Sequence, residues 1–389
     1  MCGALASSPA QAQESEPDPD AVQVHAFVSQ GFIKTTANNY LAESERGSFE
    51  FTEVGINFAK SVSDKLRIGM QLYGHDLGPI GNYAPTFDWY YLDYRFFDWF
   101  GVRAGRTKIP FGLYNESADV DAARVPILLP QSIYPIDHRD YLLAQTGGEA
   151  YGNQRLGEAG ELEYRAYGGV LDLGVPTAPN PGILVSNFKV PYVYGGRLMW
   201  HTPVEGLVAA GSYQALRFDW NYHVMPELIG PLQTAGLLPA NFGGTLPVQF
   251  RVKLWVASLE YQVGNLALAT EYSRWKGSFK SDAPRLLPPR IVNERFYGMV
   301  SYRVTPWFTP GAYYSGYYPD RKERHGRAAY QHDVALSLRF DVNEHWLLKA
   351  EGHWMNGTAA LEPSLNEGKE RHLLEKDWAA FLLKTTAYF

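Results

Sequence analysis

Charged residues are the side chains in this sequence that could do chemistry, and most stand singly inside segments that are otherwise apolar. Arg103, Arg339 and Lys349 are typical, since each has apolar or small residues on both sides. Spacing of this kind does not resemble an active site. It is the spacing expected of a strand with one face toward water and the other toward an apolar environment. Charges on the watery face would act on passing solutes through their electric field.

The first candidate set of charges lies between residues 103 and 140. Its members are Arg103, Arg106, Lys108, Asp119, Asp121, Arg124, Asp137, Arg139 and Asp140. Carboxylates and guanidinium groups facing each other across a narrow opening would create a transverse field that orders polar solutes. The same charges could instead form ion pairs that only fix this segment in place. The sequence leaves both interpretations open.

A second set is spread over the alternating segments. An Arg or Lys that faces lipid at mid-membrane costs about 2–4 kcal/mol, so mid-strand charges should face a lumen. The basic candidates are Arg67, Arg95, Arg103, Arg165, Arg197, Arg251, Lys253, Arg295, Arg303, Arg339, Lys349 and Lys384. The acidic candidates are Glu53, Asp93, Glu161, Glu163, Glu271, Asp333 and Glu351. Bases outnumber acids in these two sets, which predicts a basic lumen and a weak preference for anions. This excess depends on which alternate residues of the strands 206–219 and 248–263 face inward.

Several classes of protein are excluded by composition and motifs. The 389 residues include one cysteine, Cys2, carry a net charge of −6 and contain no run of eighteen apolar residues that could form a transmembrane helix. A pI near 6.0 argues against a nucleic-acid binder. The sequence lacks a nucleophile elbow, a P-loop, an H-E-x-x-H motif and a paired C-x-x-C. We therefore expect no enzymatic activity, no metal and no cofactor.

The elements that position these charges follow a period of two. From Trp346 to Met355, Trp346, Leu348 and Trp354 share one face, while the other face carries Lys349 and Glu351. Similar segments of roughly ten residues recur along the chain. We predict strands at 22–35, 48–61, 65–75, 87–97, 100–107, 148–156, 161–170, 192–202, 206–219, 248–263, 266–278, 294–304, 307–318, 330–340, 345–357 and 378–389.

The gaps between these segments alternate between short and long. Seven short turns on one end and eight long loops on the other predict an all-β, antiparallel, up-and-down transmembrane barrel of about sixteen strands. The longest gap, 108–147, is the third loop, and we expect it to fold into the lumen rather than cover it from outside. The spacing of Val120, Ala123 and Ile127 allows a short helix within 118–129. Trp89, Trp99, Trp200, Trp307, Trp346 and Trp378 fall near strand ends, as in the aromatic girdles of such barrels.

The two ends of the chain carry different signals. Residues 1–12 resemble the remnant of a signal peptide that ends in an A-x-A cleavage pattern. Residues 13–21 are then a flexible periplasmic segment, and residues 22–389 form the barrel. At the other end, Phe389 closes an alternating strand and resembles the C-terminal assembly signal of bacterial outer-membrane proteins.

In this layout the chain resembles the sixteen-stranded porins of Gram-negative outer membranes. The best local match is Gly101–Glu116, GVRAGRTKIPFGLYNE, a strand with two arginines that runs into a long third loop. The resemblance implies passive diffusion of ions and small hydrophilic solutes, contact with outer-membrane lipid and lipopolysaccharide, delivery by the barrel-assembly machinery and a possible homotrimer. Two alternatives stay open: a non-conducting structural or adhesive barrel, and an outer-membrane lipid hydrolase with a Ser and a His on the outer face.

Overall fold

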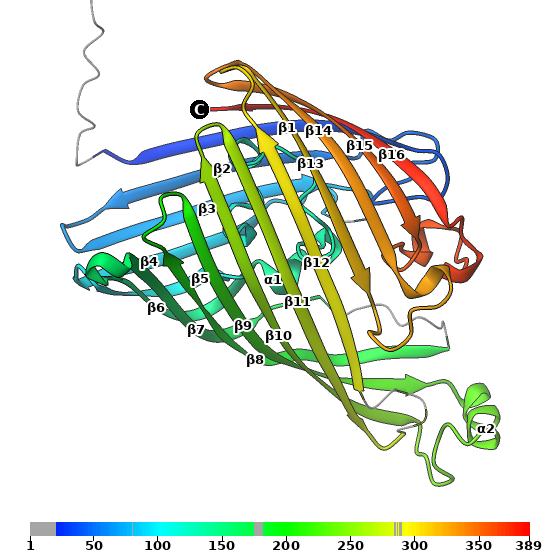
Figure 1. The fold of residues 1–389 in the computed structure, drawn as a ribbon. Coiled ribbons are helices and arrows are strands. Elements are labelled where there is room, and N and C mark those ends of the chain that lie inside the picture. The colour runs from blue at the N-terminus through cyan, green and yellow to red at the C-terminus, as the bar shows by residue number, and fades with distance from the viewer. Residues whose placement is uncertain (1–20, 80, 175–181, 284, 286, 288–289) are drawn as a thin grey trace, which may run out of the picture.

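Sixteen strands close into one barrel in the computed structural model (Figure 1). The structure describes residues 21–389 except 80, 175–181, 284, 286 and 288–289, and it leaves out the side chains of His138 and Asp140. The strands are β1 (Gln23–Thr35), β2 (Thr52–Ser61), β3 (Leu66–Asp76), β4 (Thr86–Phe97), β5 (Phe100–Lys108), β6 (Ala144–Arg155), β7 (Glu161–Leu171), β8 (Ile183–His201), β9 (Leu207–Val224), β10 (Thr245–Val263), β11 (Leu266–Ser281), β12 (Arg290–Tyr302), β13 (Phe308–Tyr318), β14 (Gln331–Asn343), β15 (Trp346–Gly357) and β16 (Asp377–Tyr388).

Each strand pairs antiparallel with its neighbours in the chain, and β1 closes the barrel by pairing with β16. In that closing pair Phe27 lies opposite Tyr388, and the backbone of Phe389 exchanges hydrogen bonds with Ala26. Closure leaves no strand with an unpaired edge. The predicted all-β, antiparallel, up-and-down barrel of sixteen strands is confirmed.

The connections keep the predicted asymmetry between the two ends of the barrel. Seven connections are short turns, such as Asp98–Trp99 between β4 and β5, and eight are longer loops, of which 109–143 between β5 and β6 is the longest. The start of β1 and the end of β16 lie at the turn end. The expectations for residues 1–12 and 13–20 fall outside the described residues. No helix among the described residues is long and apolar enough to cross a membrane.

Four strands begin three or more residues earlier than predicted. They are β6, which starts at Ala144 rather than at 148, β8 at Ile183 rather than at 192, β10 at Thr245 rather than at 248, and β12 at Arg290 rather than at 294. Pro191 lies directly before the predicted start of β8, and proline disfavours a strand because it removes a ladder hydrogen bond. The structure accommodates Pro191 with two register shifts between β8 and β9, and Asn187 there takes a positive φ of 53°.

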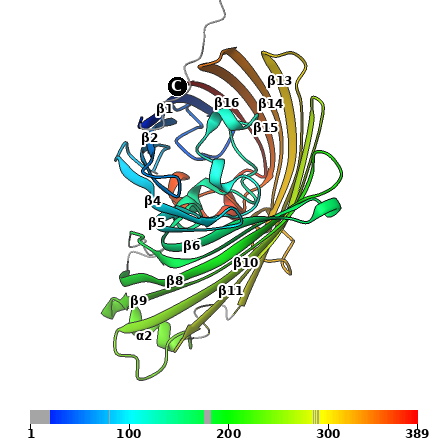
Figure 2. The same cartoon turned by 90° about the vertical axis from the view of Figure 1, so that its left-hand side faces the viewer.

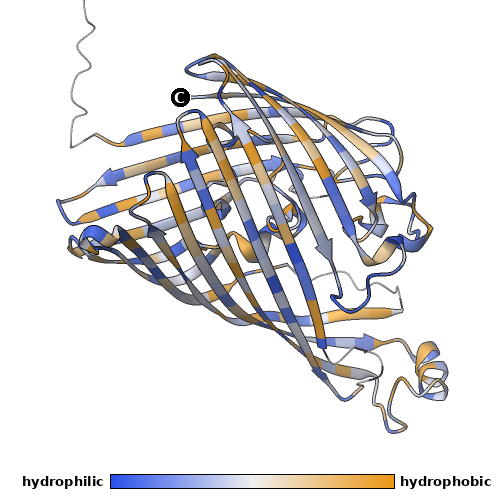
Figure 3. Cartoon of the chain, in the orientation of Figure 1, coloured by the Kyte–Doolittle hydropathy of each residue, from blue (hydrophilic) through white to orange (hydrophobic). Residues whose placement is uncertain are grey.

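Apolar side chains cover the outer face of the barrel at mid-strand. They alternate with polar residues along the strands (Figure 3), and Leu92, Leu198 and Val334 are about half exposed. Trp99, Trp200, Trp307 and Trp346 are exposed near the turn end, as the girdle interpretation requires. Trp378 departs from it. Its ring is buried against Tyr40 at a centroid distance of 5.3 Å, because this face of β16 points inward.

The prediction that Arg251 and Lys253 face the lumen is wrong. On β10 the buried positions are Val252, Leu254 and Val256, so both bases lie on the outer, exposed face. β8 to β11 are among the longest strands and reach beyond their neighbours at the loop end (Figure 1). Charge on the outside of that extension does not require contact with hydrocarbon, so the rule that mid-strand charge faces inward does not apply there.

The interior is partly filled by apolar side chains on the wall formed by β7 to β12. Leu216, Leu254 and Tyr297 from this wall are at most 1% exposed and belong to one cluster with Ile109 and Phe111 of the loop after β5. An aqueous pore predicts a polar wall all round. Here one side of the interior is instead a packed core that the loop completes.

Candidate functional site: the segment between β5 and β6

Residues 109–143, called the inner loop below, join β5 to β6. The inner loop holds three short 3-10 turns, at Asn115–Ser117, Asp121–Ala123 and Ile136–His138, and one short helix, α1 (Arg139–Leu142). Within 118–129, where the spacing allows a short helix, the structure has a single 3-10 turn, Asp121–Ala123. Pro126 disfavours helical backbone at the residue before it, and the N–H groups that follow it bind a strand carboxylate instead of helix carbonyls. Figure 2 draws the inner loop in cyan within the ring of strands.

The inner loop first meets the wall at Gly112, whose φ is +61°. A Cβ at this position would overlap Tyr134 Oη and lie 2.8 Å from Glu271 Oε1, so only glycine fits. The Gly112 N–H donates to Ser212 Oγ of β9 at 3.0 Å, and the Leu113 N–H donates to Glu271 Oε1 at 3.0 Å. The hydroxyls of Tyr134 and Tyr297 also donate to Glu271, which is 1% exposed. This carboxylate of β11 is therefore an anchor for the inner loop.

A second buried carboxylate, Glu351 of β15, holds the middle of the inner loop. Its oxygens accept the backbone N–H groups of Ile127 at 2.6 Å and Leu128 at 3.0 Å. Ser337 Oγ donates at 2.6 Å, and His353 Nε2 lies 2.9 Å away. Glu351 itself is 1% exposed. Because a buried, charged carboxylate takes part in every one of these contacts, Glu351 is a strong anchor for the inner loop.

An ion-pair cluster ties the inner loop to β15 and β16 through Asp121. Lys349 Nζ lies 3.0 Å from Asp121 Oδ1, Lys384 Nζ lies 3.5 Å from the same oxygen, and Thr386 Oγ1 donates at 2.8 Å to Asp121 Oδ2. Lys384 also pairs with Glu53 of β2. All four charged residues are buried, with at most 9% of the surface of each exposed.

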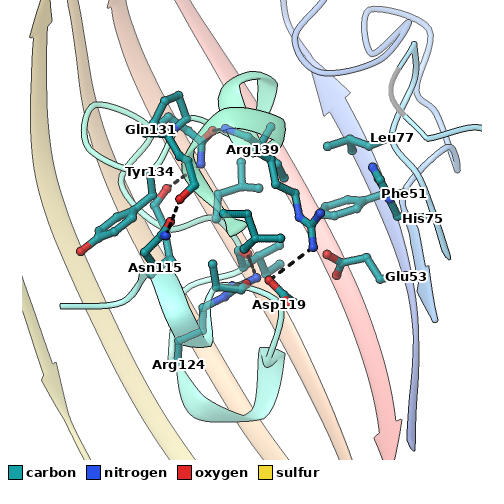
Figure 4. Close-up of a pocket in the computed structure, with 18 of the residues that line it drawn as sticks. Phe51, Glu53, His75, Leu77, Asn115, Asp119, Arg124, Gln131, Tyr134 and Arg139 are labelled. Carbon is teal, nitrogen blue, oxygen red and sulfur yellow. Dashed lines mark hydrogen bonds and ion pairs between the residues drawn. The ribbon is translucent and has the colours of Figure 1, made fainter. Parts of the chain in front are cut away.

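A separate cluster attaches the inner loop near its own ends. Lys108 Nζ lies 2.6 Å from Asp119 Oδ2, and Arg139 Nη2 lies 2.8 Å from Asp88 of β4 and 3.6 Å from Asp119. Figure 4 shows Arg139 reaching down to Asp119 beside Glu53 of β2. A cavity of about 70 Å³ lies between this part of the inner loop and the wall of β2 and β3.

Further pairs connect the predicted wall residues. Arg103 contacts Asp93 at 2.9 Å and Glu149 at 3.3 Å. Two more arginines form ion pairs: Arg165 with Glu149 and Glu116, and Arg197 with Glu116 and Glu163. Arg339 pairs with Asp341 and also donates to the backbone carbonyls of Ala122 and Arg124. Arg124 donates to the backbone carbonyls of Ala118, Pro126 and Ile127. Most charges of the predicted constriction are thus in contact with an opposite charge rather than separated by a gap.

Other predicted residues stand apart from these clusters. Arg106 donates to the backbone carbonyl of Asp88 and pairs in register with Tyr90, so the structure does not bring it into the network. Asp137 is exposed at the edge of a large cavity, and the side chain of Asp140 lies outside the described part of the chain. The remaining wall residues are exposed bases without a carboxylate within ion-pair distance among the described residues: Arg67, Arg95 and Arg303.

Three acids that lie on the interior were missed by reasoning from the sequence. Asp88 and Glu149 are at most 3% exposed, and Glu260 accepts a hydrogen bond from Tyr114 of the inner loop at 3.0 Å. Asp88 was missed because a bulge in β4 breaks the alternation there. Glu149 lies within the predicted strand 148–156, but it was not assigned to the inward face. Glu260 lies two positions beyond buried Ser258 on β10, on the face opposite to Arg251 and Lys253, and it was missed because those two bases were expected to face inward. The excess of bases is therefore smaller than the sequence suggested.

The inner loop should stay attached in mild acid. Burial raises the pKa of the Asp121 carboxyl, but the charges of Lys349, Lys384 and Arg124 outweigh burial and hold it well below its usual range. The pKa of Asp119 is lowered by Lys108 and Arg139 in the same way. A lowered folded-state pKa gives stability that is present above the unfolded value of about 3.9 and is lost only as pH falls through the folded value. We expect the amide protons of residues 119–128 to keep their protection from hydrogen exchange at pH 7 and pH 4 and to lose it only in stronger acid; a loss of protection near pH 4 would contradict this.

Comparisons with known proteins find likeness in structure only. No protein-family model and no curated protein matches the sequence. Among solved structures, OmpT, an outer membrane protein of Vibrio cholerae, is similar with a TM-score of 0.58 and 10% identity over 96% of this chain and 99% of that one. The anion-selective porin from Comamonas acidovorans gives 0.57 and 12% over 95% and 99%. The outer membrane channel DcaP of Acinetobacter baumannii gives 0.55 and 13% over 95% and 97%.

These likenesses cover nearly the whole of each chain. At 10 to 13% identity they establish a shared fold. The resemblance to sixteen-stranded porins is thus confirmed at the level of the fold. No group of three or more His, Cys, Asp or Glu residues within the described residues could hold a metal ion.

Proposed function

We propose that the protein is an outer-membrane channel of a Gram-negative bacterium, through which ions and small hydrophilic solutes diffuse passively. The observation that carries the proposal is the reversal of polarity across the barrel wall. Exposed Leu92, Leu198 and Val334 form an apolar outer face, while Glu271, Lys349 and Glu351 lie inside. A protein in water would bury the first group and expose the second, whereas a barrel in a bilayer needs this arrangement.

We further propose that the inner loop folds into the lumen and sets the narrowest part of the channel. Its ends continue from β5 and into β6, yet it hydrogen-bonds to Glu271 of β11, Glu351 of β15 and Thr386 of β16. Those partners lie on the buried faces of strands on the opposite side of the closed barrel. A lid lying outside would not reach them. Loops of this length inside compact folds are usually functional.

The proposed anion preference is weak, and it rests on two particular bases rather than on the net charge of the lumen. Arg95 lines a cavity of about 260 Å³, and Arg303 lines another of about 360 Å³. Neither has a carboxylate within ion-pair distance in the described residues. Bases that are not neutralised lower the barrier for anions more than paired ones.

The channel is tested by reconstitution into planar bilayers, where a porin gives discrete conductance steps. Changing Arg95 and Arg303 together to Glu should raise the ratio of cation to anion permeability by roughly two-fold or more. Arg251→Glu combined with Lys253→Glu makes the same change of charge on the outer face of β10 and should leave the ratio unchanged. Equal ratios in all three proteins would end the anion proposal, and absence of steps would end the channel proposal.

The partners proposed for this function follow from the barrel's outside. They are outer-membrane lipid and lipopolysaccharide, the assembly machinery acting on β16 through the terminal Phe389, and two further copies of the chain in a homotrimer. Phe389, Phe381 and Leu383 are exposed on the outer face of the last strand. The small residues Ala209, Ala210 and Gly211 of β9 would permit close packing between barrels.

One observation favours the lipid-hydrolase alternative. On the outer face near the loop end, Ser186 Oγ lies 2.6 Å from His223 Nε2, and Thr245 Oγ1 lies 3.0 Å from His223 Nδ1. A hydroxyl against an imidazole is the pairing of nucleophile and base. Among the described residues no carboxylate is hydrogen-bonded to His223, so the third member of a triad is a neutral hydroxyl. A phospholipid-release assay on the purified protein and its Ser186→Ala variant decides this alternative.

The packed interior favours the second alternative, a non-conducting barrel. The apolar cluster around Ile109 and Phe111 fills part of the space that a pore would use. The bilayer measurement above separates the two, because a plugged barrel gives no steps.

A further inference from the structure

A cavity of about 620 Å³ lies between α1 and the inner faces of β8 to β13. Its lining is dominated by aromatic rings, including Phe188, Phe218, Trp220, Phe250, Trp275 and Tyr317. Pockets of this size and character are typical of sites for small molecules. An entirely aqueous passage would not need such a wall.

The rings form a continuous row across four adjacent strands. Phe279 of β11 stacks on Phe250 of β10 at 4.2 Å between centroids, Phe250 lies 6.0 Å from Phe218 of β9, and Phe218 lies 6.0 Å from Phe188 of β8. All three pairs are stacked within about 30° of parallel. Rings held in this way give the cavity a rigid aromatic wall, formed by Phe188, Phe218 and Phe250, against which a planar apolar group would pack.

One cation, Arg295 of β12, stands at this surface. Its Cζ lies 3.7 Å from the ring centroid of Trp275 and 4.3 Å from that of Tyr317, and the residue is 2% exposed. Nη1 donates to the carbonyl of Ser132 in the inner loop at 3.0 Å. Nε is buried and has no hydrogen-bond partner among the described residues.

The nitrogens of this guanidinium that make no hydrogen bond indicate which chemical group could bind there. Nη1 is occupied by the Ser132 carbonyl, the buried Nε has no hydrogen-bond partner among the described residues, and no carboxylate of the described chain lies within ion-pair distance of the guanidinium. Burying a charge without a partner is costly. Two parallel N–H groups match the two oxygens of a carboxylate, which would supply the missing partner.

We propose that this cavity binds an amphipathic monocarboxylate, with its planar apolar body against the row of rings and its carboxylate on Nε and Nη2 of Arg295. Asp137 lines the same cavity and is exposed at its edge. A second carboxylate on the ligand would meet that negative charge, so one acidic group is preferred over two. If the site selects a class of solute for the channel, that role rests on the proposed function. The existence of the site is tested by binding alone.

The first test needs no variant. 2-Naphthoate is titrated into the purified full-length protein in detergent, and quenching of tryptophan fluorescence is followed together with calorimetry. We expect saturable binding at least ten-fold tighter than that of 2-naphthamide, which has the same shape without charge, and tighter than that of naphthalene-2,6-dicarboxylate. Equal affinity for the naphthoate and the amide, or acetate competing as well as naphthoate, would overturn the proposal.

The second test locates the site. Arg295→Met should weaken 2-naphthoate binding at least ten-fold, whereas Arg303→Met, the same change at an exposed arginine of another cavity, should not. Asp137→Asn should bind at least as tightly as the unaltered protein. If Arg295→Met does not assemble, Phe250→Ala replaces it, since loss of the central ring should also weaken binding. Unchanged affinity in an assembled Arg295→Met barrel would contradict the proposal.

The two proposals fail separately. A protein that conducts ions in bilayers but does not bind 2-naphthoate overturns the carboxylate site and leaves the channel standing. A protein that binds 2-naphthoate but gives no conductance steps overturns the channel and leaves the site.

Discussion

Glu351→Ala should raise single-channel conductance by roughly two-fold or more and lower the stability of the folded barrel. The Glu351 carboxylate alone accepts the N–H groups of Ile127 and Leu128, and it is 1% exposed. Removing this carboxylate leaves the two buried N–H groups without an acceptor. It also leaves His353 in contact with the carboxylate of Asp333 alone. Breaking a buried charged contact of this kind costs about 3–5 kcal/mol. The middle of the inner loop should then leave β15 and widen the passage.

The control for this change is Glu344→Ala in the turn between β14 and β15. The Glu344 side chain is 87% exposed, so its loss removes the same charge from the same hairpin without touching the inner loop. Conductance is measured in planar bilayers, and assembly is checked by the heat-dependent mobility of the barrel on a detergent gel. If an assembled Glu351→Ala barrel conducts like the unaltered protein, the inner loop does not limit the passage at this anchor.

Asp121→Asn should be strongly destabilising on its own, and much less so when Lys349→Met accompanies it. The single change leaves the Lys349 ammonium buried with only backbone carbonyls and a neutral amide, after the loss of a 3.0 Å ion pair. Removing both charges takes away the unpaired ammonium, while Lys384 keeps Glu53 and Arg124 keeps only backbone carbonyls, so part of the cost remains. We expect a coupling energy of about 3 kcal/mol from the double-mutant cycle, measured by urea unfolding in detergent.

The matched pair for this cycle is Glu367 and Lys369 on an external loop. Their side chains are 81% and 54% exposed with 3.1 Å between the charged atoms, so water screens the attraction. Glu367→Gln and Lys369→Met should therefore show a coupling of about 0–1 kcal/mol. A coupling at Asp121 and Lys349 no larger than this would mean that the cluster contributes little to holding the inner loop.

The barrel could be predicted because its signals are local. A strand in a bilayer alternates at every second residue, and a turn is marked by residues within a few positions, so segments such as Trp346–Gly357 and their connections can be read one at a time. The errors arose where a local rule was broken by an irregularity. Pro191 in β8 and the bulge in β4 each shift the register, and only the neighbouring strand shows how.

The candidate site was predicted as a set of residues but not as a set of contacts. Asp119, Asp121 and Arg139 were named from their charge and place in the third loop, yet their partners Asp88, Lys349 and Lys384 come from distant strands. The alternation of residues along a strand shows which side chains face inward. It does not show which of those side chains contact each other. Whether these charges oppose or pair depends on the path of the inner loop, which no local pattern encodes.

Sequence alone determined the closed antiparallel barrel, its strand number and the asymmetry of its ends, because hydrogen-bonded strands in lipid allow few alternatives. The tertiary structure decided that Arg251 and Lys253 lie outside, that Glu271 and Glu351 accept hydrogen bonds from the inner loop, and that the buried Nε of Arg295 has no hydrogen-bond partner among the described residues. Each of these depends on contacts between residues far apart in the chain. Such contacts are set by the geometry of the whole barrel, which no single segment contains.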